Sequence, residues 1–119
     1  MAGSLSNYAE AKLLDHVMGK TAFTMPTAYL ALYTAAPTDA GGGTEVSGGS
    51  YARQAIAANM AAATGTTPTL STNSGQIAFP TATGNWGTVV AIAVLDASTA
   101  GNFLWWADLT VSKTVNSGD

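Results

Sequence analysis

The chain has 119 residues and a net charge of −3 at pH 7, and only 9% of its residues are charged, against about 25% in an ordinary soluble domain. This length predicts a single domain, residues 1–119, with one hydrophobic core. Four cations provide no basic field for nucleic acid, and the absence of cysteine excludes a disulfide framework and a thiolate zinc site.

The first predicted element is a short amphipathic helix at about residues 6–18. Ser6 is a suitable N-cap, and Gly19 follows at the position where glycine ends many helices. Apolar residues recur between them at helical spacing: Ala9, Leu13, Leu14 and Val17. On the polar side lies His16, the one histidine of the chain. A lone histidine lacks the partners of a metal site or a general base, so we interpret it as a surface residue and expect no metal and no cofactor.

The same N-terminal region lacks the features of a targeting segment. It has neither the basic start nor the apolar run of a secretory signal. No apolar stretch approaches the roughly 20 residues that cross a bilayer. We therefore expect a soluble protein made in the cytoplasm, without a membrane partner.

A strand is predicted after Pro26, where "TAYLALYTA" combines aromatic and apolar residues before Pro37. It leads into a loop, residues 37–50, with five glycines. This loop lacks the Gly-Lys-Ser/Thr ending of a phosphate-binding loop. Its two carboxylates, Asp39 and Glu45, are too few for a calcium shell of about six to eight oxygens. We interpret the loop as a conformable arm that contacts another subunit; an idle surface loop is the alternative.

The middle of the chain carries weaker patterns. "SYARQAIAANM" predicts a strand up to about Ala57, although its alanines also suit a helix. Residues 64–74 are mostly threonine and serine with little to bury, and they predict an exposed connection. "GQIAFP", residues 75–80, predicts a short strand that ends at its proline.

The strongest pattern lies in the last third. An apolar run from Val89 to Leu95 is followed by a turn region and by a second strand from 103 to 111, which together predict a hairpin. The first strand is apolar on both faces, as in a central strand covered on both sides. Side-chain alternation along the second strand places Trp105 in the core and Trp106 outward or in an interface.

Short strands separated by glycine, proline, threonine and asparagine, with one helix in front, are typical of a mainly β domain. We predict an antiparallel β-sandwich or partly open barrel over about residues 27–115, preceded by one short N-terminal α-helix.

Four stretches of the sequence are distinctive: "SNYAEAKLLDHVMGK", "YLALYTAAPTDAGGGTEVSGGSYARQ", "WGTVVAIAVLDA" and "FLWWADLTVSKTVNSGD". Together they resemble successive blocks of a family of small tailed-bacteriophage virion proteins, which carry labels such as tail-fibre or head-decoration protein. The resemblance covers most of the chain, whereas residues 59–76 depart from the family pattern and their strand register stays open. It implies a structural protein of the particle, without a catalytic motif.

We therefore predict a non-enzymatic virion protein, made in the host cytoplasm. The leading hypothesis is a capsid decoration or cement protein on the capsid exterior, which binds the major capsid protein and stabilises the head. The alternative is a tail-fibre or adhesion module that binds a host surface glycan through Tyr51, Trp106 and Asp108. A surface of small uncharged residues favours contact between subunits, and we expect a homotrimer. The candidate interface residues are Asp39, Gly42, Thr44, Glu45, Tyr51, Arg53, Trp106 and Asp108.

An enzymatic role is not supported by the sequence. The carboxylates are scattered without a paired motif, and the serines lack a nucleophile elbow and a credible base.

The C-terminal residues 116–119, "NSGD", are a turn signal, and a turn normally returns the chain to pair with the strand it has left. We expect either that the natural chain continues beyond Asp119 or that a neighbouring subunit covers the strand edge at residues 109–115.

Overall fold

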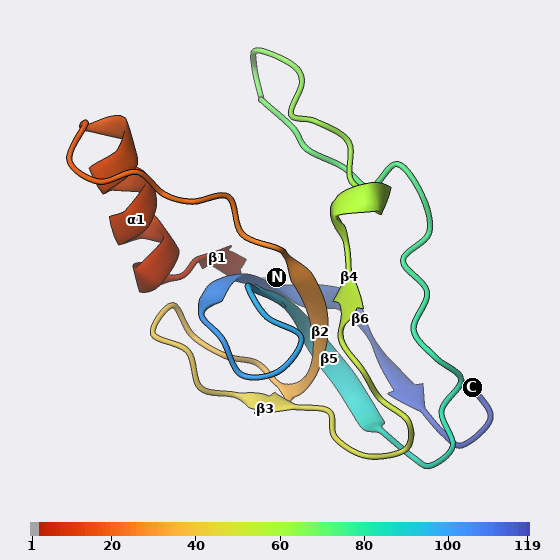
Figure 1. Ribbon diagram of the computed structural model, residues 1–119. Helices are drawn as coiled ribbons and strands as arrows, with labels where there is room; N and C mark the ends of the chain where they lie inside the picture. Colours follow the sequence, from red (N-terminus) through yellow and green to blue (C-terminus); the bar gives the residue numbers. More distant parts are fainter. Residues whose placement is uncertain (1–2) are drawn as a thin grey trace.

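The computed structural model describes residues 3–119, which form an open sheet with one helix and long connections around it (Figure 1). The helix is α1 (Asn7–Val17), and a short 3-10 helix, η1, spans Ala57–Asn59. The strands are β1 (Gly3–Leu5), β2 (Tyr29–Ala35), β3 (Thr44–Glu45), β4 (Gln54–Ala55), β5 (Gly87–Leu95) and β6 (Phe103–Val115). Within residues 3–119, no helix has the length and apolar character needed to cross a membrane.

The strands follow the order β1, β6, β5, β2, β3 across the sheet, and β4 also pairs with β2. Every pairing is antiparallel. The sheet is not closed, because β1 and β3 lie at its two ends. These features confirm the predicted mainly β, antiparallel fold in its partly open form, with one short N-terminal helix. The predicted strand after Pro26 and the predicted hairpin, now β5 and β6, are both present.

β5 is the central strand, between β2 and β6, and both of its faces are covered. One face carries a cluster that β2 and β5 build together: Ala31, Tyr33, Ala91, Ala93 and Leu95. The other face carries one cluster around Val94, which includes Ala9 of α1, and another around Val89, which includes Trp86. The prediction of a central strand covered on both sides is confirmed.

An extra residue in β6 changes which of its side chains share a face. The pairing with β5 skips Leu104, between the pairs formed by Phe103 and Trp105. A bulge of this kind lets two successive side chains point to the same side. Leu104 and Trp105 pack in one cluster, and Phe103 and Trp106 pack in the cluster of the opposite face. The prediction that Trp105 is a core residue is wrong, because both tryptophans are half-buried and Leu104 is the buried residue.

Ser6 caps α1 as predicted, because its hydroxyl accepts a hydrogen bond from the Ala9 N–H at 3.0 Å. The backbone N–H of Ser6 donates to the carbonyl of Leu104 at 2.8 Å, which ties the start of the helix to β6. Ser6 and Ala9 are buried. The helix is therefore fastened to the sheet at its first turn.

The remainder of α1 extends away from the sheet (Figure 1). Leu14, Val17 and the C-cap residue Met18 are exposed, so much of the apolar side of this helix faces water. His16 is exposed, as predicted, and its Nδ1 accepts a hydrogen bond from the Phe23 N–H at 3.0 Å. That bond holds the connection after the helix against its last turn.

The glycine-rich loop at 37–50 is folded back onto the body rather than extended as an arm. Thr38 and Gly41 exchange two backbone hydrogen bonds of 2.9 and 2.8 Å. Gly43 has a φ of +75°, and a Cβ on it would lie 2.6 Å from the Ala35 carbonyl oxygen. Only glycine accepts this conformation and this close approach together. The loop is therefore held against the body and is not a free arm, and β3 in its second half adds an edge to the sheet. Its contact with another subunit stays a prediction.

The segment that does project is residues 60–73, which we call the arm (Figure 1). Its two limbs are joined by isolated bridges between Met60 and Asn73 and between Thr64 and Leu70. The predicted exposure of residues 64–74 is confirmed, since all of them are exposed. Before the arm, the strand predicted up to about Ala57 shortens to β4, and η1 follows.

The strand predicted at residues 75–80 is absent. Ile77 and Phe79 are half-buried and pack in the two clusters on one face of the sheet, while Ala78 between them is exposed. The alternation in the sequence is therefore real, but within residues 3–119 this segment joins no ladder. An extended segment can bury alternate side chains against a neighbouring surface without strand pairing.

The predicted C-terminal turn is present, and it returns the chain to residues 82–86. The Gly118 N–H donates to the Ala82 carbonyl at 2.7 Å, and the Ala82 N–H donates to the Asp119 carbonyl at 3.0 Å. Within residues 3–119, β6 pairs with β1 on its outer side at 105–107, and its register with β5 shifts again before Lys113. Such irregularities are a common means of protecting a strand edge.

Candidate functional site

The fold gathers five of the eight candidate interface residues into two polar groups. Glu45, Tyr51 and Arg53 form the first, around β3 and the segment that leads into β4. The second group consists of Asp39 and Trp106. The other three candidates belong elsewhere: Gly42 and Thr44 are exposed near the sheet edge, and Asp108 is half-buried on β6.

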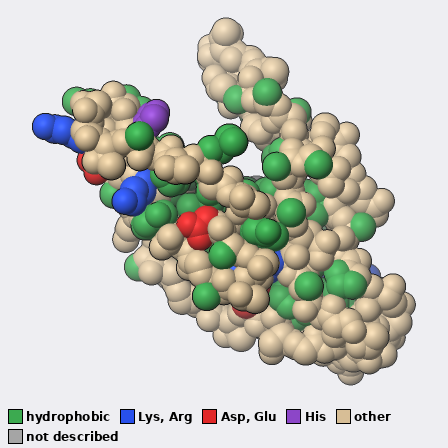
Figure 2. Space-filling model, viewed as in Figure 1, with side chains coloured by type: hydrophobic (Ala, Val, Ile, Leu, Met, Phe, Trp, Pro, Cys, Tyr) green, Lys and Arg blue, Asp and Glu red, His purple; other side chains and the backbone are tan. Residues whose placement is uncertain are grey.

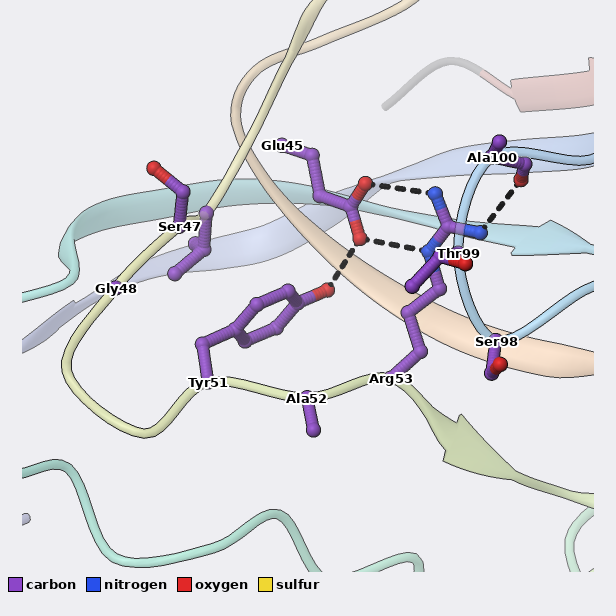
Figure 3. A pocket seen from close by; sticks show the side chains of 10 residues that line it. Glu45, Ser47, Gly48, Tyr51, Ala52, Arg53, Ser98, Thr99 and Ala100 are labelled. Carbon is purple, nitrogen blue, oxygen red and sulfur yellow. Dashed lines mark hydrogen bonds and ion pairs between the residues drawn. The ribbon is translucent and has the colours of Figure 1, made fainter.

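Arg53 and Glu45 form a two-pronged ion pair (Figure 3). Arg53 Nε donates to Glu45 Oε1 and Nη2 donates to Oε2, both at 2.8 Å. The Arg53 side chain is only 8% exposed and that of Glu45 is 25% exposed. Because β3 pairs with β2 at Tyr33 and Glu45, the carboxylate is held at a fixed place on the sheet edge. Parallel hydrogen bonds in this geometry are the strong form of an ion pair.

Tyr51 connects this ion pair to the sheet. Its hydroxyl donates to Glu45 Oε1 at 2.8 Å and accepts the Leu32 N–H of β2 at 3.0 Å. Its ring is stacked on Phe79 with centroids 6.1 Å apart and meets Trp86 edge-on at 5.4 Å. These aromatic neighbours leave Tyr51 poorly placed to stack on a sugar, so the geometry does not favour its predicted glycan contact.

The third guanidinium nitrogen of Arg53 holds the connection between β5 and β6. Nη1 donates to the carbonyls of Ala97 and Ala100, each at 2.8 Å, and Figure 3 shows the bond to Ala100. An open hollow of about 360 Å³ lies between this connection and residues 45–53. Arg53 therefore joins the segment before β4 to the β5–β6 connection, at residues 44 and 47 positions later in the sequence.

The chemistry of this group is that of a structural clamp. Both carboxylate oxygens of Glu45 and all three guanidinium nitrogens of Arg53 accept or donate hydrogen bonds inside the chain. Within residues 3–119, no three His, Cys, Asp or Glu side chains gather in a way that could hold a metal ion. What the arrangement can do is fix the loops at one end of the sheet.

The second group fastens the loop that follows β2. Asp39 Oδ1 accepts hydrogen bonds from Trp106 Nε1 at 3.1 Å and from the Ser4 hydroxyl of β1. The Asp39 carbonyl also accepts the Asn7 N–H at 2.9 Å. The hydrogen bonds from Ser4 and Trp106 lower the pKa of Asp39. Trp106 is thus half-buried rather than fully outward, and its N–H has an internal partner. Its position in an interface stays a prediction.

The environment also shifts the ionisation of the first group. Partial burial by itself would raise the pKa of Glu45, but hydrogen bonds from Arg53 and Tyr51 and the charge of Arg53 outweigh it and lower the pKa. Burial, with a smaller contribution from the bond to Glu45, raises the pKa of Tyr51. Glu45 is therefore charged and Tyr51 is a hydrogen-bond donor at neutral pH.

We expect acid to weaken the fold through Glu45. A carboxyl whose pKa is lower in the folded than in the unfolded chain stabilises the fold above its ordinary pKa, 4.5, and this contribution is lost as pH falls through the lowered value. Melting temperatures measured from pH 7 down to pH 3 should fall less for Glu45→Gln than for the parent chain, relative to each protein at pH 7. Equal falls in the two proteins would contradict this assignment.

Sequence reasoning missed the residues that complete the first group. Trp86 Nε1 donates to the Gly49 carbonyl at 2.8 Å, and the carbonyls of Ala97 and Ala100 complete the set of Arg53 acceptors. Backbone carbonyls have no signature in a sequence. A buried tryptophan next to a glycine-rich loop is a signal for close packing, but it does not identify the partner.

Comparison with known proteins places the chain in a family. No curated protein matches the sequence significantly. A family model described as podophage GP4 fiber I protein gp80, or Gp80, matches residues 4–119. The match covers nearly the whole chain and confirms the resemblance to virion structural proteins of tailed phages. The chain therefore belongs to the Gp80 family of phage virion structural proteins.

Proposed function

We propose that this protein is a subunit of a virion fibre, and that it acts by assembly rather than by catalysis. The observation that carries this proposal is the match to a fibre-protein family over residues 4–119. The geometry agrees with it, because the polar side chains around Arg53 are used to hold the chain's own loops. A repeating structural subunit needs such rigidity, since loops fixed before assembly lose little conformational entropy when they meet a neighbour.

A capsid decoration protein that binds the major capsid protein is the second candidate. One observation favours it: residues 54–95 contain no charged side chain, so a broad contact there would bury few charges. Seating on a capsid lattice at many points would also make weak contacts durable. Self-association as a homotrimer is compatible with either assignment.

Copy number and position in the virion separate the two candidates. We expect quantitative mass spectrometry of purified particles to find this chain at far fewer copies than the major capsid protein, and electron cryomicroscopy to place it in an appendage. A number close to that of the capsid subunits, with density over the head, would support the decoration role instead. Absence of the chain from purified particles would overturn both.

A further inference from the structure

The open hollow beside Arg53 lies between two walls that the chain itself holds in place. One wall is the segment 45–53, and the other is the connection 96–102 between β5 and β6 (Figure 3). Arg53 joins the walls through its bonds to backbone carbonyls of the connection. The connection is also closed on itself, because the Asp96 carboxylate accepts the backbone N–H of Asn102 at 2.6 Å and its side-chain N–H at 2.9 Å. The shape of the hollow is therefore set without a ligand.

Both walls contain backbone in a conformation that residues other than glycine rarely adopt. Within residues 3–119, the non-glycine residues with a positive φ are Ser50, at +65°, and Ala100, at +51°. Ala100 lines the hollow, and Ser50 lies in the turn that the Tyr51 N–H closes on the Gly48 carbonyl at 3.0 Å. Strained positions of this kind persist where the surrounding structure holds them, and they cluster at ligand clamps. Their presence on both sides of one hollow favours a binding site over an incidental gap.

The ion pair that lines the hollow has unused hydrogen-bonding capacity. Arginine has five N–H donors, and the four bonds of Arg53 leave one N–H of Nη2 without an acceptor within residues 3–119. Glu45 Oε1 accepts two hydrogen bonds, whereas Oε2 accepts one and has room for another. Because Nη2 and Oε2 are bonded to each other, the spare donor and the spare acceptor are neighbours. Two adjacent hydroxyl groups, each able to donate and to accept, match this arrangement.

Three hydroxyl groups line other parts of the hollow, those of Ser47, Ser98 and Thr99. Figure 3 shows Ser47 on one side of the ion pair and Ser98 and Thr99 on the other. Within residues 3–119, none of these hydroxyls forms a hydrogen bond with the chain, and all three residues are exposed. The hydroxyls can therefore turn towards a ligand without releasing any part of the fold.

The charges of the hollow are balanced. Arg53 and Glu45 are the charged residues that line it, and they are paired with each other. Figure 2 shows that charged side chains are sparse over one whole face of the molecule, as expected for a chain with 9% charged residues. An anion in the hollow would meet the carboxylate and a cation would meet the guanidinium, in each case without a free counter-ion. A neutral polar ligand avoids both costs.

We propose that this hollow binds a neutral hexose unit of a carbohydrate. Its volume of about 360 Å³ lies at the lower end of the range for small-ligand sites, about 300 to 1,000 Å³. Because the hollow is open, one unit of a longer chain fits in it while the remaining units extend into solvent. The Arg53–Glu45 pair bonds two neighbouring ring hydroxyls, and the hydroxyls of Ser98 and Thr99 bond a third.

Recognition at this site rests on hydrogen bonds rather than on stacking. The ring of Tyr51 stays against Phe79 and Trp86, and the residues that line the hollow do not include Trp106 or Asp108. Without an aromatic platform, the affinity of one site should be low, with a Kd on the order of millimolar. Many copies in one particle would make such binding durable.

Titration of the isotope-labelled chain, followed by nuclear magnetic resonance, tests the site. The probes are methyl α-D-glucopyranoside, methyl α-D-mannopyranoside and methyl β-D-galactopyranoside, each raised to roughly a hundred times the expected Kd. At least one of them should shift the amide signals of residues 45–53 and 96–102 until the shifts saturate. The proposal is overturned if none of the three glycosides produces saturable shifts there.

Variants of the rim test the role of the hydroxyls. Ser98→Ala combined with Thr99→Val removes two hydrogen-bonding groups and should raise the Kd about tenfold or more, while the melting temperature stays close to that of the parent. The matched control combines Ser112→Ala on β6 with Thr66→Val in the arm, since both residues are exposed and their hydroxyls form no hydrogen bond within residues 3–119. An unchanged Kd in the rim variant, or an equal rise in the control, would overturn the assigned contacts.

Two further probes test the class of ligand. N-acetylneuraminic acid is an anionic sugar, and N-acetylglycinamide represents a protein backbone. Both should bind more weakly than the best neutral glycoside, because the first meets the Glu45 carboxylate and the second lacks hydroxyl groups. Tighter binding of the anionic sugar would contradict a neutral ligand, and tighter binding of the amide would indicate a protein partner instead.

This inference goes beyond assembly, and its tests do not depend on where the chain lies in the virion. If electron cryomicroscopy places the chain in a fibre and the glycosides do not bind, the sugar site is overturned and the proposed function stands. If the glycosides bind and the chain covers the head, the sugar site stands and the fibre assignment is overturned.

Discussion

Replacing Trp86 with alanine should lower the free energy of unfolding by about 3 to 5 kcal/mol, the largest effect that we expect from a single substitution. Trp86 is 7% exposed and packs with Val46, Ala82 and Val89 in one of the two clusters on its face of the sheet. Removal of the ring would leave a cavity under the loop that follows β3 and would remove one of the two hydrogen bonds that the Gly49 carbonyl accepts, the other being from the Thr83 N–H. Urea denaturation measures this loss.

Two further variants separate the contributions of Trp86. Trp86→Phe keeps an aromatic ring but removes the N–H that Gly49 accepts, and it should cost about 1 kcal/mol for the hydrogen bond. Trp105→Ala is the matched control, because Trp105 is a half-buried tryptophan of the same sheet. It should destabilise the protein less than Trp86→Ala does. A Trp105→Ala variant that lost as much stability would contradict the assignment of Trp86 to the core.

Replacing Arg53 with methionine should lower the free energy of unfolding by about 3 kcal/mol, near the low end of what the loss of one partner from a buried ion pair costs. Methionine keeps most of the apolar stem but leaves Glu45 without its counter-ion and removes the donor to Ala97 and Ala100. The low end applies because a quarter of the Glu45 side chain reaches water. Urea denaturation measures the loss, and hydrogen exchange should report faster opening of residues 96–102.

Lys113→Met is the control for Arg53→Met, because Lys113 is an exposed cation on β6. Its effect should remain within about 0.5 kcal/mol. Adding Glu45→Leu to Arg53→Met should recover part of the lost stability, since the unpaired carboxylate is then removed. Equal stabilities for Arg53→Met and Lys113→Met would show that the ion pair does not hold the loops.

The extent of agreement between sequence and structure differs between elements for identifiable reasons. The helix boundary at Ser6 and the hairpin of β5 and β6 were predictable because a cap and a continuous apolar run act through neighbours in the sequence. The strand at 75–80 was predicted wrongly, because alternation of side chains reports burial and a ladder also needs a partner backbone. Its half-buried side chains, Ile77 and Phe79, pack against the sheet although its backbone pairs with no strand within residues 3–119.

For the candidate site, the sequence identified the residues but not their role. Glu45, Tyr51 and Arg53 stood out in the sequence as polar and aromatic residues beside a glycine-rich loop, and the fold brings them together. Their role did not follow from their identities. An ion pair at a contact surface and an ion pair that clamps two loops use the same side chains, and the difference lies in backbone carbonyls more than 40 residues away.

By itself, the sequence determined that this is a mainly β chain with one short capped helix and a central apolar hairpin, because these properties depend on composition and local order. Its resemblance to phage virion proteins rests on whole sequence blocks, and the family match confirms it. Only the tertiary structure decided the rest. The extra residue at Leu104 reassigned the two tryptophans to their faces, and the attachment of α1 by its first turn left Leu14 and Val17 facing water. Both outcomes depend on where distant strands pair, since a shift of one residue in register exchanges the two faces of a strand.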